Sequence, residues 1–299
     1  MKKLWVKILV AMLVIWTISA VYWHVGNTGQ VTPIRFKDNP STFQLVMDDL
    51  NLGPCPRIRA KSAIVVDLGT GKVLMKKDES CVRPIASLTK LTTSLVFLST
   101  KPNLFSIATV TKEDRDGAGH SRLYVGEKLT LYDLMHVMLI CSDNVAARIV
   151  ARSAGMTQDQ FVTEMNQYAA AMKLTNTHFG DPTGLDSTNV STAAEYALIF
   201  KAALEDDIIS EIVSMKIHSF MPINGKRNFT VYNTNRLLYG KANIIGGKTG
   251  YIYQSGYCLA IGMESAGKKL AAIVLGAPSS GSRFRDAAKL LTTLGGHKI

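Results

Sequence analysis

Cysteine and acidic residues are both scarce in this chain of 299 amino acids. Its four cysteines form no C-x-x-C pair, which disfavours zinc sites and thioredoxin-type redox sites. Asp and Glu number 23 against 34 Lys and Arg, so the formal net charge is +11. The basic residues are scattered and make no long polybasic run, which disfavours binding to nucleic acid. Two explanations of the excess positive charge are equally good: binding to an anionic membrane or polymer, and a solvated basic surface without a partner.

Histidine is too sparse to suggest a metal centre. The chain has six histidines, and His120, His136, His178 and His218 are well separated and show no metal-ligand spacing. We therefore expect no metal and no cofactor. The hydrophobic share of 47% excludes a disordered or fibrous protein and allows one or two domains with a sizeable core.

The amino terminus has the pattern of an export signal. Residues 1–7 include three lysines and are followed by an apolar run over residues 8–23. We predict that residues 1–25 are a signal peptide or an N-terminal membrane anchor. Small residues at 18–20 permit cleavage, whereas the aromatic residues that follow suit a membrane interface, so both alternatives stay open. The mature chain is predicted to act outside the cytoplasm, in the periplasm or on the membrane that faces it.

An oxidising compartment permits disulfide bonds. Cys55 and Cys81 bracket a predicted β-hairpin, so theirs is the one pairing that we consider. Cys141 and Cys258 lie in apolar segments and are expected to be plain buried thiols.

The folded body is predicted to start near Cys55. Residues 26–54 are polar and irregular and are predicted to be a spacer, and residues 55–299 are predicted to be a single catalytic domain. A hairpin is expected from residues 63–67 and 73–75, and Pro84 is expected to open a helix that runs to residue 99.

The remaining elements follow from periodicity. Helices are predicted at 131–139, 144–152, 158–172, 192–204 and 282–294; strands are predicted at 216–220, 227–231, 256–263 and 269–275, with a turn at 265–268. The last helix has an apolar stripe that is expected to pack on a sheet. Because strands and helices do not alternate, this order predicts an α+β fold with an antiparallel sheet flanked by helices and a mainly helical subdomain.

A candidate nucleophile lies at the start of the first helix, in Ser87-Leu88-Thr89-Lys90. A serine hydroxyl needs a base within hydrogen-bond reach, and residues three apart on a helix share one face. A partly desolvated lysine has a lowered pKa and can accept the proton. The pattern is weak alone, because the same Ser-x-x-Lys spacing recurs from Ser265 to Lys268 in a predicted turn.

Two further motifs follow in order and make the pattern specific. Ser142-Asp143-Asn144 lies between two helical runs, and Lys248-Thr249-Gly250 enters a strand. This ordered trio is the known signature of penicillin-binding proteins and class A β-lactamases. Residues 119–123, 125–130, 138–144 and 177–186 resemble the low-molecular-mass D-alanyl-D-alanine carboxypeptidases and endopeptidases, serine peptidase family S11. The resemblance extends over residues 63–294 and implies a fold like that of β-lactamases and DD-peptidases.

The resemblance also implies roles for individual residues. It makes Ser87 the nucleophile, Lys90 its general base and Ser142 a proton relay to the leaving amine. It makes Asn144, Lys248, Thr249, Gly250 and Tyr251 the substrate-binding residues, with the backbone N–H groups of Ser87 and Tyr251 as the oxyanion hole. Tyr at position 251 departs from the His or Thr expected in the family.

The function implied is hydrolysis of D-alanyl peptide bonds in peptidoglycan stem peptides, with β-lactams acylating the same serine. Two alternatives stay open: a β-lactamase, and a non-hydrolytic penicillin-sensing module. Glu164 superficially resembles a deacylating glutamate but lies in an amphipathic helix and is predicted to be structural, and Asp143 is predicted to be a helix N-terminal carboxylate. The chain ends soon after Lys248-Thr249-Gly250, which slightly favours an endopeptidase over a carboxypeptidase.

Overall fold

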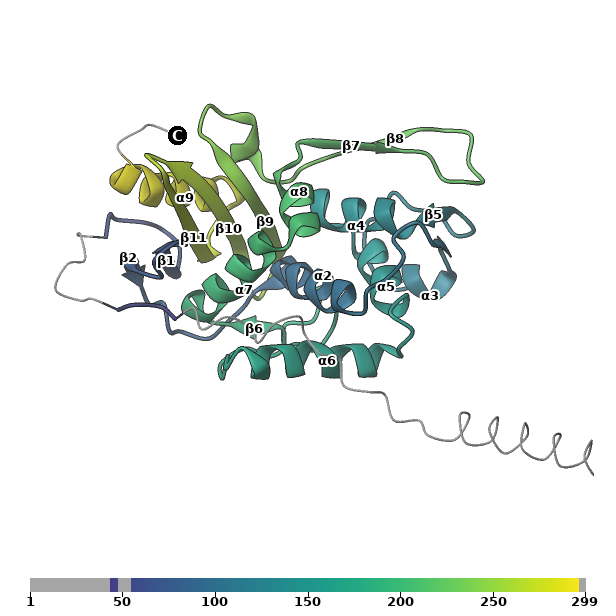
Figure 1. Cartoon of the computed structure of the whole chain (residues 1–299), viewed down its shortest axis with the longest axis horizontal. Helices are drawn as coiled ribbons and strands as arrows, with labels where there is room; N and C mark the ends of the chain where they lie inside the picture. Colours follow the sequence, from purple (N-terminus) through teal and green to yellow (C-terminus); the bar gives the residue numbers. More distant parts are fainter. Residues whose placement is uncertain (1–43, 48–54, 296–299) are drawn as a thin grey trace, which may run out of the picture. The chain divides into compact units, whose positions relative to one another are not determined.

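A five-stranded antiparallel sheet is the centre of the fold (Figure 1). The computed structural model describes residues 44–47 and 55–295. The strand order is β2-β1-β11-β10-β9. The strands are β1 (Ser62–Asp67), β2 (Val73–Lys77), β9 (Ile244–Ile252), β10 (Gly256–Ser265) and β11 (Lys268–Ala277). Both predicted hairpins are confirmed, since β1 pairs with β2 and β10 pairs with β11.

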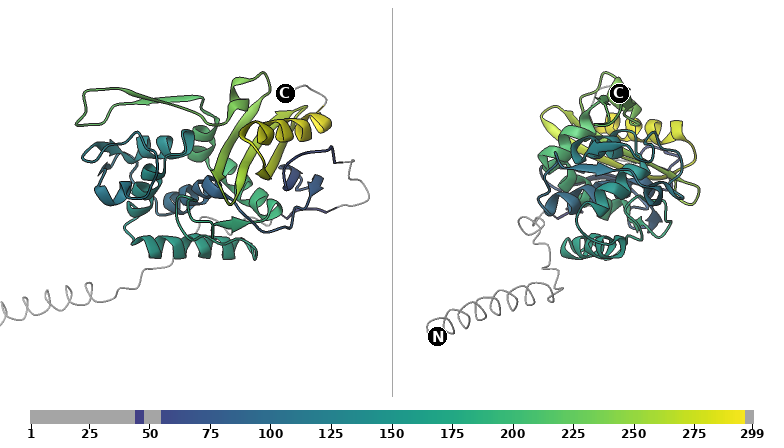
Figure 2. Two further views of the ribbon diagram at one scale, coloured as in Figure 1. Left: turned by 180° about the vertical axis from the view of Figure 1, so that it is seen from behind. Right: turned by 90° about the vertical axis from the view of Figure 1, so that its right-hand side faces the viewer.

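Helices cover both faces of this sheet. α7 (Ala193–Glu205) and α8 (Asp207–Ser214) pack on one face, and α9 (Ser280–Gly295) packs on β10 and β11. Successive residues of a strand point to opposite faces, so Ile64 belongs to the core under α7 and Val65 to the core under α9. Figure 2 shows α9 in front of the strands when the molecule is seen from behind. The apolar stripe predicted for the last helix therefore packs on the sheet as expected.

The predicted mainly helical subdomain, called the helical block below, lies beside the sheet (Figure 1). It consists of α2 (Thr89–Ser99), α4 (Leu131–Ile140), α5 (Asn144–Arg152) and α6 (Gln158–Ala171). Side-chain caps set the starts of α4, α5 and α6, and α2 has none. Asp143 accepts from the backbone N–H of Ala146 at 3.0 Å and starts α5. This confirms the prediction that Asp143 is a helix N-terminal carboxylate. The one-turn helix α3 (Lys112–Arg115) and α8 were not predicted.

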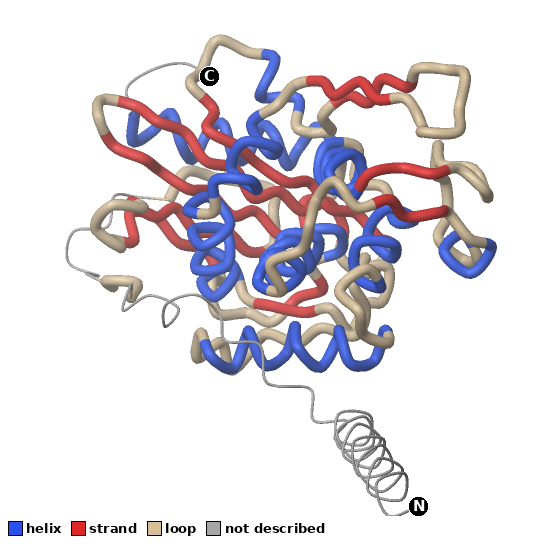
Figure 3. Tube along the Cα trace, turned by 45° about the vertical axis from the view of Figure 1, so that its right-hand side comes forward, coloured by secondary structure: helices blue, strands red, loops and turns tan. Residues whose placement is uncertain are grey.

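Three two-stranded sheets complete the described part of the chain (Figure 3). They pair β3 (Arg83–Pro84) with β6 (Val190–Ser191), β4 (Ile107–Thr109) with β5 (Lys128–Thr130), and β7 (Ile217–Phe220) with β8 (Phe229–Tyr232). The hairpin β7–β8 extends beside α4. The predicted strands at 216–220 and 227–231 are thus confirmed.

The prediction that Pro84 opens a helix is wrong. Pro84 pairs with Val190 in β3, and the next backbone N–H, that of Ile85, donates to the carbonyl of Asn189 at 3.0 Å. These long-range bonds hold the backbone extended, so the first helical turn is the 3-10 turn η2 (Ala86–Leu88) and α2 starts only at Thr89. Ser87 lies in this 3-10 turn, two residues before α2 begins.

The Cys55–Cys81 pairing, which the sequence left open, is not formed, because both side chains are exposed free thiols. The carboxylate of Asp286 accepts from the backbone N–H of Arg59 at 3.0 Å and that of Ala60 at 2.8 Å. This draws the segment before β1 toward α9, whereas Cys81 leads into β3. Cys258 is fully buried as expected, and Cys141 is half-buried.

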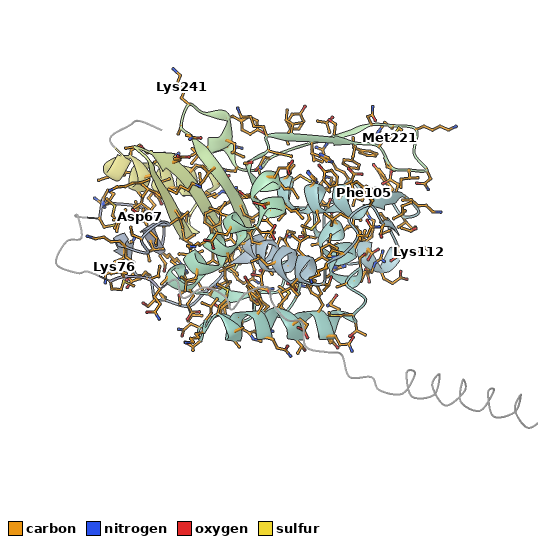
Figure 4. All side chains as sticks on the ribbon, viewed as in Figure 1. Asp67, Lys76, Phe105, Lys112, Met221 and Lys241 are labelled. Carbon is orange, nitrogen blue, oxygen red and sulfur yellow. The ribbon has the colours of Figure 1, made fainter. Side chains whose placement is uncertain are left out.

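Two of the lysines labelled in Figure 4 lie at separate places on the surface. Figure 4 shows Lys112 on the helical side and Lys241 beyond η3 (Arg236–Tyr239), far from each other and pointing outward. Among the described residues, no group of His, Cys, Asp and Glu is placed to hold a metal ion. No helix in the same part of the chain has the length and apolar character needed to span a membrane.

The predicted signal or anchor at residues 1–25 lies outside the described residues. In the predicted spacer, Val46 bonds to the backbone of the first hairpin.

Candidate active site

The three sequence motifs meet at one place. Ser87 comes from η2, Lys90 from α2, Ser142 and Asn144 from the junction of α4 and α5, and Lys248 from β9. Lys90 Nζ lies 3.0 Å from Ser87 Oγ and 2.7 Å from Asn144 Oδ1. Lys248 Nζ lies 2.7 Å from Ser142 Oγ. The structure therefore brings together all the catalytic candidates that the sequence suggested.

The backbone around Ser87 is tightly enclosed. Ala86 has a positive φ of 50°, an uncommon conformation for a residue with a side chain. A Cβ on Gly250 would lie 2.8 Å from the carbonyl oxygen of Ile85, and one on Gly184 would lie 2.0 Å from that of Ala86. Both neighbouring segments thus approach the nucleophile closely because they lack side chains at these points.

Lys90 is completely buried and is held by three acceptors. Besides Ser87 and Asn144, its ammonium donates to the carbonyl oxygen of Thr183 at 2.6 Å. Burial lowers the pKa of Lys90 to about 8, against the opposing effect of the Asp181 and Asp143 carboxylates. About a tenth of a lysine with this pKa is neutral at pH 7, and that neutral form can accept the proton of the hydroxyl beside it.

Ser142 occupies a strained position between two helices. Its φ is 65°, in the left-handed region that non-glycine residues seldom adopt. The next residue, Asp143, caps α5 and accepts from the hydroxyl of Ser121 at 2.7 Å. Asn144 Nδ2 donates to the carbonyl of Ala118 at 2.8 Å. The two residues that follow Ser142 are therefore fixed in place, and Ser142 lies 2.7 Å from Lys248 Nζ.

β9 presents the third motif along the edge of the sheet. Burial, and then the charge of nearby Lys90, keep the pKa of Lys248 well below its usual value. Thr249 Oγ1 lies 2.6 Å from Thr234 Oγ1, and Tyr251 is half exposed and stacks on Tyr257 at 4.3 Å between ring centroids. An edge strand has free backbone groups that can pair with an extended peptide.

Several site residues were missed by sequence reasoning. Thr183 contributes a carbonyl, which has no signature in a sequence, and Asp181 and Gly184 shape the loop that presents it. Their segment, 177–186, was noticed only as a resemblance. Arg283 of α9 donates from Nη1 to the carbonyl of Gly250 at 3.0 Å and so supports β9 from outside the motif. Burial lowers the pKa of Arg283 to about 10, which leaves it charged at neutral pH.

The histidines are not all separate in space. His136 and His218 stack with ring centroids 4.1 Å apart, and His218 Nε2 lies 2.9 Å from Asp133 Oδ1. This pairing joins the hairpin β7–β8 to α4 and was not expected from their sequence spacing. Glu164 is buried on α6, consistent with the structural role predicted for it.

Comparison with solved structures assigns the fold. The crystal structure of a Streptomyces DD-transpeptidase matches with a TM-score of 0.76 at 29% identity, over 80% of this chain and 98% of that one. The predicted α+β fold of the DD-peptidase type is therefore confirmed, and the serine–lysine site lies within it.

Comparison of the sequence with a family model and with individual relatives identifies the family. Residues 51–279 match the model of the peptidase S11 family, D-alanyl-D-alanine carboxypeptidase. A D-alanyl-D-alanine endopeptidase of Haemophilus influenzae is 31% identical over 241 residues, which cover 79% of this chain and 82% of the relative. The D-alanyl-D-alanine carboxypeptidase DacA of Escherichia coli is 32% identical over 82% of this chain and 64% of its own length. The chain belongs to the peptidase S11 family of D-alanyl-D-alanine carboxypeptidases and endopeptidases.

The close approach of Gly184 to the turn that carries Ser87 predicts a loss of stability when a side chain is added at position 184. Gly184 and Gly155 have φ values of 81° and 76°, but a Cβ on Gly155 would meet nothing within 4 Å. We expect Gly155→Ala to lower the free energy of unfolding by about 1 kcal/mol, the backbone strain alone. Gly184→Ala should lower it by about 3 kcal/mol or more, because overpacking adds to the strain. Urea unfolding of both variants gives the comparison, and equal losses would contradict the steric argument.

Proposed function

We propose that this chain is a serine D-alanyl-D-alanine peptidase that hydrolyses peptidoglycan stem peptides through an acyl-enzyme on Ser87. The observation that carries the proposal is the 3.0 Å contact between Ser87 Oγ and the buried Lys90 Nζ. Membership of the peptidase S11 family supports the substrate class.

Acylation begins when neutral Lys90 takes the proton of Ser87. Oγ then attacks the carbonyl carbon of the scissile bond, and the oxyanion is stabilised by the backbone N–H groups of Ser87 and Tyr251. Ser142 passes its proton to the leaving amine as the C–N bond breaks and takes up the proton that Lys90 holds, which makes Lys90 neutral again. Lys248 supports this relay, since its Nζ is within 2.7 Å of Ser142 Oγ. Water then attacks the ester carbonyl while Lys90 takes a proton from it. The bond to Ser87 Oγ breaks, Ser87 receives that proton from Lys90, and the acid product is released.

The substrate lies along β9 in this proposal. Gly250 lets the peptide backbone approach, and the hydroxyl of Thr249 and the ammonium of Lys248 face its terminal carboxylate. Asn144 Oδ1 already accepts from Lys90, but an amide oxygen has two lone pairs, so it can also accept from an amide N–H of the substrate.

We also propose that the enzyme acts outside the cytoplasm, where its substrate is, and that residues 1–25 export it or anchor it to the membrane. β-Lactams are expected to acylate Ser87 as substrate mimics. The β-lactamase and penicillin-sensing alternatives have no supporting observation here.

The nucleophile can be tested with a fluorescent penicillin. The wild-type protein should become covalently labelled, and Ser87→Ala should abolish labelling because no other hydroxyl contacts Lys90 Nζ among the described residues. Ser265→Ala is the matched control, since it removes the serine of the second Ser-x-x-Lys pattern and should label normally. Labelling that survives Ser87→Ala would falsify the assignment of the nucleophile.

The pH dependence tests Lys90 as the base. Because burial lowers its pKa to about 8, the neutral base form increases as pH rises through that value. The second-order acylation rate constant should therefore fall about tenfold for each pH unit below the pKa and level off above it. Stopped-flow acylation from pH 6 to pH 9.5 measures this. A rate constant that is flat over that range would exclude Lys90 as the titrating base.

Substrate preference stays a prediction, because endopeptidase and carboxypeptidase relatives match at 31% and 32% identity. We expect the soluble fragment from Cys55 to cleave a cross-linked muropeptide dimer faster than it releases D-alanine from a pentapeptide monomer. Mass spectrometry of the products distinguishes the two. Release of D-alanine alone would contradict the endopeptidase preference.

A further inference from the structure

A single loop, residues 181–184, contacts both members of the proposed serine–lysine pair from outside their helix. We propose that the Asp181 carboxylate is a positioning residue that holds this loop against Ser87 and Lys90. The inference rests on the proposed roles of those two residues. It concerns a side chain in none of the three motifs.

The Asp181 carboxylate closes the loop on itself. Oδ2 accepts from the backbone N–H of Thr183 at 3.1 Å and from the hydroxyl of the same residue. Oδ1 accepts from the backbone N–H of Gly184 at 2.9 Å and from the side-chain amide of Asn189. The backbone N–H of Asp186 also donates to Oδ1, at 3.4 Å. Five donors therefore converge on one charged side chain, and charge-assisted bonds of this kind fix geometry well.

The closed loop docks on α2 through two carbonyl groups. The carbonyl of Thr183 accepts from Lys90 Nζ at 2.6 Å, and that of Pro182 accepts from Thr93 Oγ1 at 2.7 Å. Lys90 and Thr93 are three residues apart and so share one face of the helix. A rotation of the loop would move an acceptor away from the ammonium.

The same loop also restrains the nucleophile. Gly184 packs so closely on the η2 turn that a Cβ there would lie 2.8 Å from the backbone nitrogen of Ser87. That nitrogen is one of the two proposed oxyanion donors. Asp181 thus acts on the base through Thr183 and on the nucleophile through Gly184.

The carboxylate also acts on Lys90 by its charge. The groups that face Lys90 are Asp181 from the loop, Asp143 from the start of α5, Cys141 from the end of α4 and Lys248 from β9. Burial lowers the pKa of Lys90, and Asp181 is the strongest of the charges that raise it. Loss of this carboxylate should therefore lower the Lys90 pKa further while loosening its position.

These two effects make the proposal testable with Asp181→Asn. The amide keeps one oxygen acceptor but cannot accept from the backbone N–H of Thr183 at its other end. We expect the plateau acylation rate constant at high pH to fall about 10- to 100-fold, because small misplacements of reacting groups are costly. The midpoint of the pH profile should move to lower pH. A loss of folding alone would not move that midpoint.

Asp186→Asn is the matched control. Asp186 is an exposed carboxylate of the same segment whose side chain accepts from the backbone N–H of Thr188 at 2.8 Å. Asp186→Asn removes the same charge but leaves in place the bond from the Asp186 backbone N–H to Asp181 Oδ1 at 3.4 Å. Both the plateau and the midpoint should therefore match the wild type. Thr183→Val keeps the Asp181 charge but removes the hydroxyl that bonds to it, so it should lower the plateau and leave the midpoint in place.

A second measurement decides the inference independently of acylation. The pKa of Lys90 is read from an NMR titration of the full-length protein with 13Cε-labelled lysine, with the resonance assigned by its loss in Lys90→Gln. Asp181→Asn should lower this pKa relative to wild type and Asp186→Asn. The proposal is overturned if Asp181→Asn changes neither the Lys90 pKa nor the plateau acylation rate constant. A wild-type protein that penicillin does not label would overturn only the proposed function.

Discussion

The burial of two lysine ammonium groups is the constraint on which the rest of the site depends. Lys90 and Lys248 are both almost inaccessible to water, and a buried cation is costly unless acceptors replace the lost solvent. The acceptors come from four separate segments: the η2 turn, the α4–α5 junction, the loop at 181–184 and β9 itself. The fold brings these four segments to one place. Burial also makes the lysines reactive, because it lowers the pKa of both.

Close backbone approach is the second requirement. Glycine at positions 184 and 250 lets two segments press against the turn that carries Ser87, from the loop and from the sheet. The turn itself is strained at Ala86, as the neighbouring site segment is at Ser142. Strain of this kind persists only where the surroundings over-determine the backbone, and here the surroundings are the caps, carbonyls and strand pairings already described.

The local sequence pattern predicted the helices and strands well, but it did not predict which of them contact one another. Apolar periodicity located the helices of the helical block and both large hairpins, because each element buries one face and the spacing of its apolar residues must match. Pro84 was misplaced because pairing with Val190 overrode a local helix signal. The Cys55–Cys81 pairing, considered because the two residues bracket a hairpin in sequence, is not formed. Asp286 draws the segment that follows Cys55 to α9. His136 and His218 were taken as unrelated because stacking across a helix and a hairpin has no sequence spacing.

The sequence by itself determined the class of fold, the family and the candidate nucleophile with its partners, because three ordered motifs and helix or strand periodicity are properties of residue order. Only the tertiary structure decided how that chemistry is held: that Thr183 offers its carbonyl to Lys90, that Asp181 shapes the loop and that Arg283 supports β9. The reason is physical. Backbone carbonyls are common to every residue, and which of them meets a buried ammonium depends on how distant segments pack, a property that no local pattern contains.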